Sequence, residues 1–203
     1  TCCNGTALES HTKLQDTIYF RSANQQALYV NLFIASTLIW TERKISVQQV
    51  TDFPYADTTT LIVKGSGRFD LKVRVPSWAT RGFFVRINGR DEAVKATPGS
   101  YVTIARTWRD KDTVEVRMPF TFHLDHVMDQ PNVASLLYGP VLLAAEEAGA
   151  RTDWRQVVLD ATDISRSIVG DPATLRFSIA GVPFKPFYET YGRHSVYLYV
   201  SFK

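Results

Sequence analysis

Cysteine is nearly absent from the sequence. The chain of 203 residues has two cysteines, and these are neighbours, Cys2 and Cys3. A disulfide between adjacent cysteines closes a small strained ring, and the chain offers no third cysteine as another partner. A secreted scaffold held together by disulfides is therefore excluded, whereas the length is sufficient to bury a hydrophobic core.

Long apolar runs and clusters of basic residues are absent too. The longest apolar stretch, at residues 140–145, is far shorter than the ~20 residues that span a bilayer, so we expect no membrane partner. The 23 Lys and Arg residues are scattered singly among 20 Asp and Glu residues, so we expect no nucleic acid partner either. Phosphate loops, dinucleotide fingerprints and serine nucleophile elbows are also missing.

One segment has the spacing of an amphipathic helix. Ala7, His11, Leu14 and Ile18 recur every three or four residues, which predicts a helix from Thr6 to about residue 21. Glu9 and Lys13 add a favourable pair four residues apart. No other segment gives a comparable helical signal.

The rest of the chain has the pattern of short strands. Residues 68–75 alternate strictly between apolar and charged side chains, and Asn88-Gly89 is a strong hairpin signal. Turn signals recur every 8–12 residues with no helices between them, which favours an antiparallel β-sandwich over a parallel α/β fold. We therefore predict a mainly β chain, an antiparallel β-sandwich preceded by one α-helix. The expected strands are 27–34, 37–40, 45–50, 68–75, 83–87, 93–95, 101–104, 113–118, 121–124, 134–137, 141–145, 175–179 and 195–200.

Three segments divide the chain. Residues 1–25 form a terminal loop and the helix, and residues 26–145 form the sandwich. Residues 146–203 form a linker and closing strands, because the pattern weakens from 146 to 170 and Pro183 to Pro186 separate the last two strands.

The cysteine pair is the first candidate for chemistry. It precedes Asn4-Gly5-Thr6, a turn-and-cap sequence, so we expect it on a loop that leads into a helix N-terminus, where the helix dipole favours a thiolate. Such a thiolate serves as a metal ligand or as a nucleophile. The alternative is that two small hydrophobic residues happen to be neighbours. A closed zinc site needs four ligands, and the spacing of the four histidines does not complete one.

Other polar residues point less clearly to a site. His123 and His126 are three apart, so in a strand they face opposite sides, and we interpret them as polar residues of an edge strand. His194 lies in a tyrosine-rich segment, residues 188–199, which either fills the core or lines a sugar-binding surface. We favour the core. Glu9 and the pair Glu146-Glu147 have no carboxylate partner that the sequence identifies.

Several segments together resemble one family of enzymes. Residues 1–13, TCCNGTALESHTK, are similar to the Cys-Cys-x-Gly-Thr-x-x-Glu-x-His segment of bacterial β-L-arabinofuranosidases of glycoside hydrolase families 127 and 146. Further segments follow in the same order as in that family's sandwich region: 18–20, 28–34, 74–78, 88–89, 98–101 and 138–144. The resemblance covers most of residues 1–145, with 186–189 and 196–197 near the end.

This resemblance implies a fold and a mechanism. Family members carry an (α/α)6 helical barrel followed by β-sandwich domains, so the predicted helix would be the last one of a barrel whose remainder lies upstream of Thr1. Cys2 would be the nucleophile of a retaining reaction on an arabinofuranoside. Zinc would be held by Cys2, Cys3 and two barrel residues, a cysteine and a glutamate, while another barrel glutamate acts as acid and base.

The chain departs from the family pattern in two ways. Ala7 replaces a glycine, and the barrel residues are missing. We therefore expect this chain alone to be inactive and to bind zinc weakly or not at all, and we expect its helix to self-associate or pack on the sandwich through an apolar stripe. The competing hypothesis is a non-catalytic carbohydrate-binding or structural sandwich. A thiol-redox module is disfavoured because the Cys-x-x-Cys spacing is missing.

Overall fold

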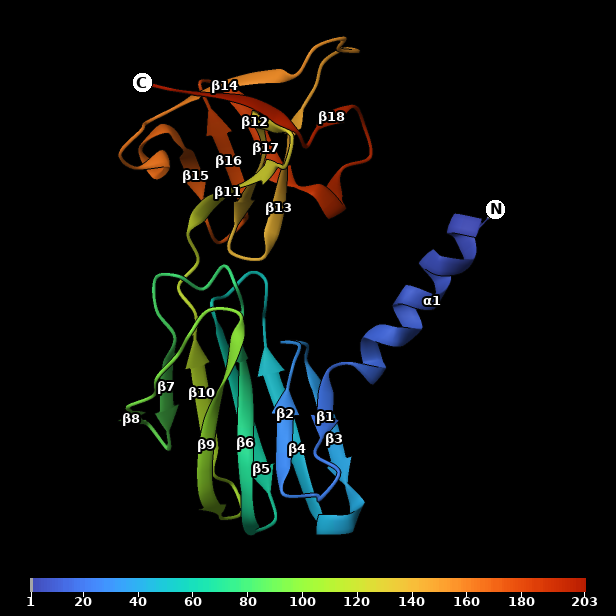
Figure 1. The fold of residues 1–203 in the computed structure, drawn as a ribbon, viewed down its shortest axis with the longest axis vertical. Helices are drawn as coiled ribbons and strands as arrows, with labels where there is room; N and C mark the ends of the chain where they lie inside the picture. Colours follow the sequence, from blue (N-terminus) through green and yellow to red (C-terminus); the bar gives the residue numbers. More distant parts are fainter. Residues whose placement is uncertain (1) are drawn as a thin grey trace. The chain divides into compact units, whose positions relative to one another are not determined.

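The computed structural model describes residues 2–203, except for the side chains of residues 2–4 and 11. The protein is mainly β, as predicted, with one α-helix among the described residues (Figure 1). It divides into two compact units, the first ending at Met118 and the second spanning Pro119–Lys203.

The helix α1 spans Cys2–Asp16, so the expected boundaries were wrong at both ends. It ends where the Thr17 hydroxyl donates to the carbonyls of Lys13 and Leu14. Ile18 then leaves the helical path, because its carbonyl accepts the backbone N–H groups of residues 31 and 32. Leu8 and Leu14 are exposed, whereas Ile18 is buried and does not extend the exposed apolar stripe.

The first unit is a β-sandwich of two sheets. One sheet has the strand order β1-β2-β6-β9 and the other β3-β4-β5-β10-β7-β8. All pairs are antiparallel except β2 and β6, which run parallel. The strands are β1 Tyr19–Arg21, β2 Ala27–Val30, β3 Ser36–Trp40, β4 Ile45–Thr51, β5 Thr58–Lys64, β6 Gly67–Val75, β7 Phe84–Ile87, β8 Arg90–Glu92, β9 Ser100–Trp108 and β10 Thr113–Arg117.

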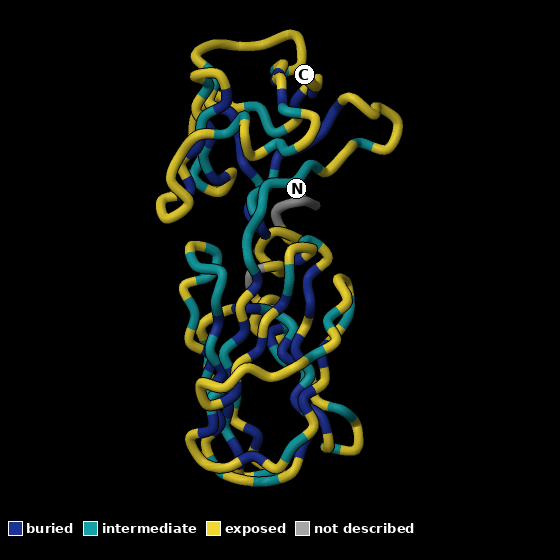
Figure 2. Tube along the Cα trace, turned by 90° about the vertical axis from the view of Figure 1, so that its left-hand side faces the viewer, coloured by how far each residue is buried: buried dark blue, intermediate teal, exposed yellow. Residues whose placement is uncertain are grey.

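The alternation along β6 places one face of that strand in the core. Phe69, Leu71, Val73 and Val75 are buried with residues of the opposite sheet in one cluster, and buried and exposed positions alternate along the traces of Figure 2. Phe69 lies 5.5 Å, between ring centroids, from both Trp40 and Trp108. This aromatic group joins the two sheets, since Trp40 belongs to one and Trp108 to the other.

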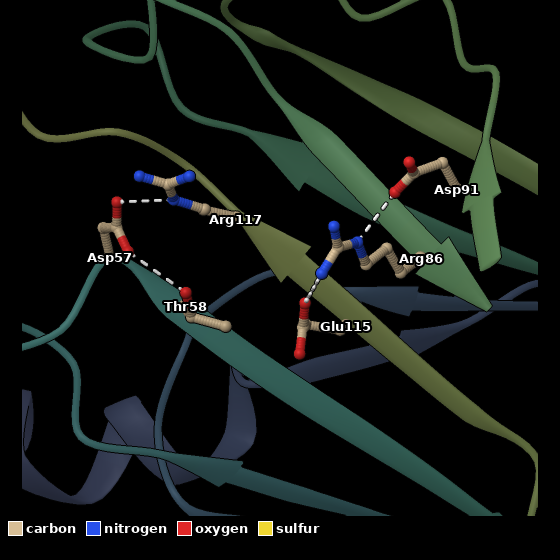
Figure 3. Close-up of polar contacts among 6 residues, drawn as sticks. All are labelled: Asp57, Thr58, Arg86, Asp91, Glu115 and Arg117. Carbon is tan, nitrogen blue, oxygen red and sulfur yellow. Dashed lines mark hydrogen bonds and ion pairs between the residues drawn. The ribbon is translucent and has the colours of Figure 1, made fainter. Parts of the chain in front are cut away.

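The outer face of the six-stranded sheet carries charge. Arg86 of β7 donates to Asp91 of β8 at 2.7 Å and lies 3.7 Å from Glu115 of β10 (Figure 3). On the same face Arg117 donates to Asp57 at 3.1 Å. These ion pairs keep this face of the sheet polar while its other face packs in the core.

The hairpin at Asn88-Gly89 is confirmed, with positive φ angles of 52° and 77° as a two-residue turn of type I′ requires. Its returning strand is β8 rather than the expected residues 93–95. The sequence pattern missed β5, whose first three residues are threonines. Thr59 nevertheless points inward and is buried.

The second unit contains one sheet with the order β14-β19-β12-β13-β17-β16-β15, to which β11 and β18 add by pairing with β12 and β13. β14 at one end of this order and β16, next to the other end, contribute to one core, so the sheet curls around it. The strands are β11 Phe122–Val127, β12 Gln130–Tyr138, β13 Val141–Glu146, β14 Arg155–Leu159, β15 Val169–Asp171, β16 Arg176–Ile179, β17 Val182–Pro186, β18 His194–Ser195 and β19 Leu198–Phe202.

Two expectations about this unit were wrong. The segment 146–170, expected to be a linker, contains β14, which pairs in parallel with β19. The prolines 183 and 186, expected to separate strands, lie in β17 opposite Ser178 and Leu143. The chain divides at residue 118, before the boundary expected at 145, because β11–β13 pair with each other and with later strands.

Candidate functional site

Cys2 and Cys3, the candidate nucleophile and metal ligands, are the first two residues of α1. The helix thus begins at the pair, not at the Thr6 position expected after a loop. The side chains of both cysteines lie outside the described residues, so their roles remain predictions. Their position in the first helical turn is one in which the helix dipole stabilises a thiolate.

The other candidates on the helix do not gather into a site. Glu9 forms the expected ion pair with Lys13, at 2.6 Å on the exposed surface. The side chain of His11 lies outside the described residues. Across the side chains that the structure does describe, no three His, Cys, Asp or Glu residues are grouped to hold a metal ion.

The two histidines of β11 are confirmed as polar residues of an edge strand. In the described part of the chain β11 pairs with β12 alone. The Nδ1 atom of His126 lies 2.9 Å from the carbonyl oxygen of Pro131. His123 is half-buried and lies 3.4 Å from the carbonyl of Thr121. His126 therefore contacts the partner strand of its hairpin, and His123 contacts the residue before β11.

The second unit contains an open cleft of about 840 Å³ between two segments, 147–154 and 192–197. The first segment connects β13 to β14, and the second contains β18. Glu146 pairs with His194 in the ladder of β13 and β18, so the two segments start side by side. We call this hollow the β13–β18 cleft.

Glu147 lies at the base of the β13–β18 cleft and holds both of its walls. Its side chain is 4% exposed. One carboxylate oxygen accepts hydrogen bonds of 2.9 Å from Arg155 Nε and from Ser195 Oγ. The other oxygen accepts from a terminal nitrogen of Arg155 and lies 3.8 Å from Arg151. The hydrogen bonds from Arg155 are the main reason that the pKa of Glu147 lies below its ordinary value, against the opposing effect of burial.

The rim of the cleft is aromatic. Trp154 and Tyr197 are 47% and 48% exposed and meet edge to face, with ring centroids 6.2 Å apart. The His194 ring packs against Phe187 at 5.4 Å and its Nδ1 atom lies 2.8 Å from the carbonyl of Gly192. The expectation that the tyrosine-rich segment fills the core was wrong, because four of its tyrosines are exposed: Tyr188, Tyr191, Tyr197 and Tyr199.

Sequence reasoning named Glu147 and His194 singly but did not bring them together. The available signal was the succession of Glu, Arg, Asp, Trp and Arg in residues 147–155, which combines charge with an aromatic residue in a short connection.

No described helix is both long and apolar enough to cross a membrane.

Comparison with known proteins finds similar folds in solved glycoside hydrolases. The family model described as the β-L-arabinofuranosidase GH127 middle domain matches residues 27–120. A solved glycoside hydrolase is similar over 98% of this chain and 40% of its own, with 20% identity and a TM-score of 0.77. A GH127 β-L-arabinofuranosidase from Geobacillus stearothermophilus T6 is similar over 93% of this chain and 35% of its own, at 21% identity and a TM-score of 0.72.

A third structure, a GH127 β-arabinofuranosidase, is similar over 91% of this chain and 36% of its own, with 19% identity and a TM-score of 0.69. The chain therefore spans 35–40% of the length of these structures. No curated protein sequence matches the chain.

Proposed function

We propose, because residues 27–120 match the family model of the GH127 middle domain, that the chain is the C-terminal β-sandwich portion of a retaining glycoside hydrolase that resembles β-L-arabinofuranosidase. The observation that carries the proposal is the match of the first sandwich to this family, with the Cys2-Cys3 pair preceding it on α1. The substrate of the intact protein is an arabinofuranoside, and the rest of its active site lies outside these residues, in a helical barrel to which α1 belongs.

Cys2 is the nucleophile of the proposed reaction. Its thiolate attacks the anomeric carbon, the bond to the departing alcohol breaks, and a glutamate from outside this chain protonates the alcohol. Water then displaces the sulfur while the same glutamate accepts a proton. Each of the two displacements inverts the configuration of the anomeric carbon, so the product retains the configuration of the substrate. The first turn of α1 contributes by favouring the thiolate over the thiol.

The chemistry of the two cysteines fits zinc in part. Thiolate sulfurs are good zinc ligands, but Cys2 and Cys3 supply half of a tetrahedral set, and the described side chains provide no cluster to complete it. Zinc, when bound, keeps a coordinating thiol deprotonated at neutral pH. We expect this chain alone to bind zinc weakly or not at all, because the remaining ligands lie elsewhere in the intact protein.

The experiment that tests this function uses the intact protein and an aryl β-L-arabinofuranoside. Cys2→Ser should lower kcat/KM by at least about a thousandfold, the scale of losing a catalytic nucleophile. Peptide mass spectrometry of the wild-type enzyme, with the covalent intermediate trapped during turnover, should show one pentosyl group on Cys2. Thr12→Ser, a conservative change on the same helix that keeps the hydroxyl, is the matched control and should leave turnover unchanged. Full turnover by Cys2→Ser would refute the role of Cys2.

We propose that the isolated 203-residue chain has no hydrolase activity, because it lacks the acid/base residue. Hydrolysis by this chain at the rate of the intact protein would contradict that.

We also propose that the chain associates with itself through α1, where Leu8 is 73% and Leu14 48% exposed. Light scattering should report a dimer or larger species that Leu8→Lys converts to a monomer. A monomer for both proteins would exclude self-association.

A further inference from the structure

The β13–β18 cleft has the construction of a binding site. Its volume of about 840 Å³ lies within the range of small-molecule sites, ~300–1,000 Å³. Its walls are held before any ligand arrives, because the buried carboxylate of Glu147, on the first segment, binds Ser195 on the other segment and Arg155 at the start of β14. A backbone hydrogen bond of 3.0 Å from Glu147 to Arg193 joins the same two segments. Preorganisation of this kind lowers the entropic cost of binding.

The aromatic rim offers a stacking surface. Trp154 and Tyr197 stay about half exposed although each could bury a large apolar area. Within the described part of the chain, the indole N–H of Trp154 and the phenol of Tyr197 make no hydrogen bond. An aromatic face with a free donor at its edge suits a sugar ring, whose C–H face is apolar and whose hydroxyls are polar.

The polar groups beside the rim match hydroxyls. The His194 Nδ1 atom lies 2.8 Å from the Gly192 carbonyl and donates to it, so the Nε2 atom is the ring nitrogen left for a ligand. Arg193 has no ion-pair partner among the described residues and presents N–H donors. The cleft therefore offers guanidinium N–H donors and an imidazole nitrogen to a ligand with several hydroxyl groups.

The charges of the cleft favour a neutral ligand. The charged side chains that line the cleft are two carboxylates, Glu147 and Asp153, and two guanidinium groups, Arg151 and Arg193, so the lining has no net charge. Arg155 binds Glu147 but is not one of the lining residues. An anionic ligand would meet the Asp153 carboxylate, and a cationic one would meet the Arg193 guanidinium. A carbohydrate without charged groups avoids both costs.

We propose that the β13–β18 cleft is a non-catalytic binding site for a sugar residue of a neutral, arabinose-containing oligosaccharide. The ring stacks on Tyr197 beside the Trp154 indole, and its hydroxyls bind Arg193 and His194. The choice of arabinose rests on the proposed function, whereas the choice of a neutral sugar rests on the cleft itself. Such a site would keep a glycan chain near the hydrolase between turnovers.

Nuclear magnetic resonance of the 15N-labelled 203-residue chain tests the proposal. The four tryptophans give separate indole N–H signals, and Trp154→Phe identifies the signal of Trp154. Titration with a neutral arabinose oligosaccharide should shift that signal saturably. Tyr197→Ala and Arg193→Ala should each weaken binding about tenfold or more, since each removes one contact of the bound sugar. Tyr191→Ala, an exposed tyrosine outside the cleft lining, is the control and should leave binding unchanged.

Three results would overturn the proposal: no shift of the Trp154 signal at tens of millimolar sugar, equal loss of binding with Tyr191→Ala and Tyr197→Ala, or a shift with uronic acid oligosaccharides alone. Binding of xylose or galactose oligosaccharides without binding of arabinose would overturn the ligand class. None of these results depends on Cys2, so a failure here is distinct from a failure of the proposed hydrolase function, which the Cys2→Ser assay decides.

Discussion

The Ser195 hydroxyl donates a hydrogen bond of 2.9 Å to Glu147 Oε1 and so joins residues 48 positions apart in the chain. Glu147 is also bound by Arg155 through both of its oxygens. Because the carboxylate side chain is 4% exposed, its removal would leave Arg155 and Ser195 without their acceptor. The walls of the β13–β18 cleft depend on this one carboxylate.

Glu147→Ala should therefore lower the free energy of unfolding of the second unit by about 1–3 kcal/mol, the cost of leaving buried partners unsatisfied. Hydrogen–deuterium exchange of β13 and β14 is the measurement, since it reports this unit separately. Glu146→Ala is the matched control: its ion pair with Lys185 is partly exposed, so the change should be below about 1 kcal/mol. Equal effects of the two substitutions would contradict the anchoring role of Glu147.

Asp160 gives the second unit a dependence on acid pH. Its carboxylate accepts hydrogen bonds from the Thr162 hydroxyl and from the backbone N–H groups of Thr162 and Asp163. These bonds, that of the hydroxyl first, lower its pKa from 3.8 to about 2. The folded pKa is below the unfolded one, so the stabilisation is present above pH 3.8 and is lost as the pH falls through about 2.

Asp160→Asn should remove the acid dependence of stability that this carboxylate causes. At pH 5 the wild type should have the larger free energy of unfolding, and the two proteins should converge below about pH 2. In a carbon-13 titration of the carboxyl groups, Thr162→Val should move the Asp160 midpoint upward. Thr174→Val, which removes a hydroxyl bound to Asp171 instead, should leave that midpoint in place. An unchanged midpoint in Thr162→Val would show that the hydroxyl is not the main cause.

Phe69→Ala should destabilise the first unit by about 3–5 kcal/mol, because the ring fills the space between Trp40 and Trp108 and its loss leaves a cavity. Urea unfolding followed by tryptophan fluorescence is the measurement, as both tryptophans are fully buried. Ile39→Ala, at a position 73% exposed, should change the unfolding free energy by less than about 0.5 kcal/mol. A loss below about 1 kcal/mol for Phe69→Ala would show that the core closes over the gap.

The turns at the end of the first sandwich depend on Asp112, whose side chain is 8% exposed. Burial opposes its ionisation, but hydrogen bonds from the Arg109 backbone and the Asn88 amide hold its pKa below the ordinary value. Asp112→Ala should lower the free energy of unfolding of the first unit by about 1–3 kcal/mol, because it leaves the groups that donate to this carboxylate without an acceptor. Asn88→Gly keeps the positive φ of the hairpin. A double-mutant cycle between the two should give a coupling above about 0.5 kcal/mol, and additive effects would exclude a shared contact.

The fold was predictable where local pattern and burial agree. The alternation of β6 and the turn at Asn88-Gly89 are complete in the sequence, and both were confirmed. The prediction failed where tertiary pairing overrides local signals. β5 was missed although its threonines and aliphatic residues suit a strand, and the burial of Thr59 depends on neighbouring strands that the local sequence does not show. The prolines of β17 usually mark an interruption, yet the sheet accommodates them opposite Ser178 and Leu143.

The two candidate sites, the Cys2-Cys3 pair and the β13–β18 cleft, also differ in how far the sequence alone could indicate them. Two adjacent cysteines are visible in any listing of the residues, so the Cys2-Cys3 pair could be singled out at once. The β13–β18 cleft could not be, because its central carboxylate binds one residue 8 positions away and another 48 positions away. Only the pairing of β13 with β18 brings these groups together.

The position of β19 sets the order in which the two units can form during synthesis. The first sandwich has all of its strands once residue 117 has left the ribosome. The second unit must wait, because β19, its last strand in the sequence, lies between β14 and β12 in the sheet. Until residues 198–202 emerge, β14 has no neighbouring strand and the core beneath β12 and β13 is incomplete, so the second unit is more exposed to aggregation on the ribosome than the first.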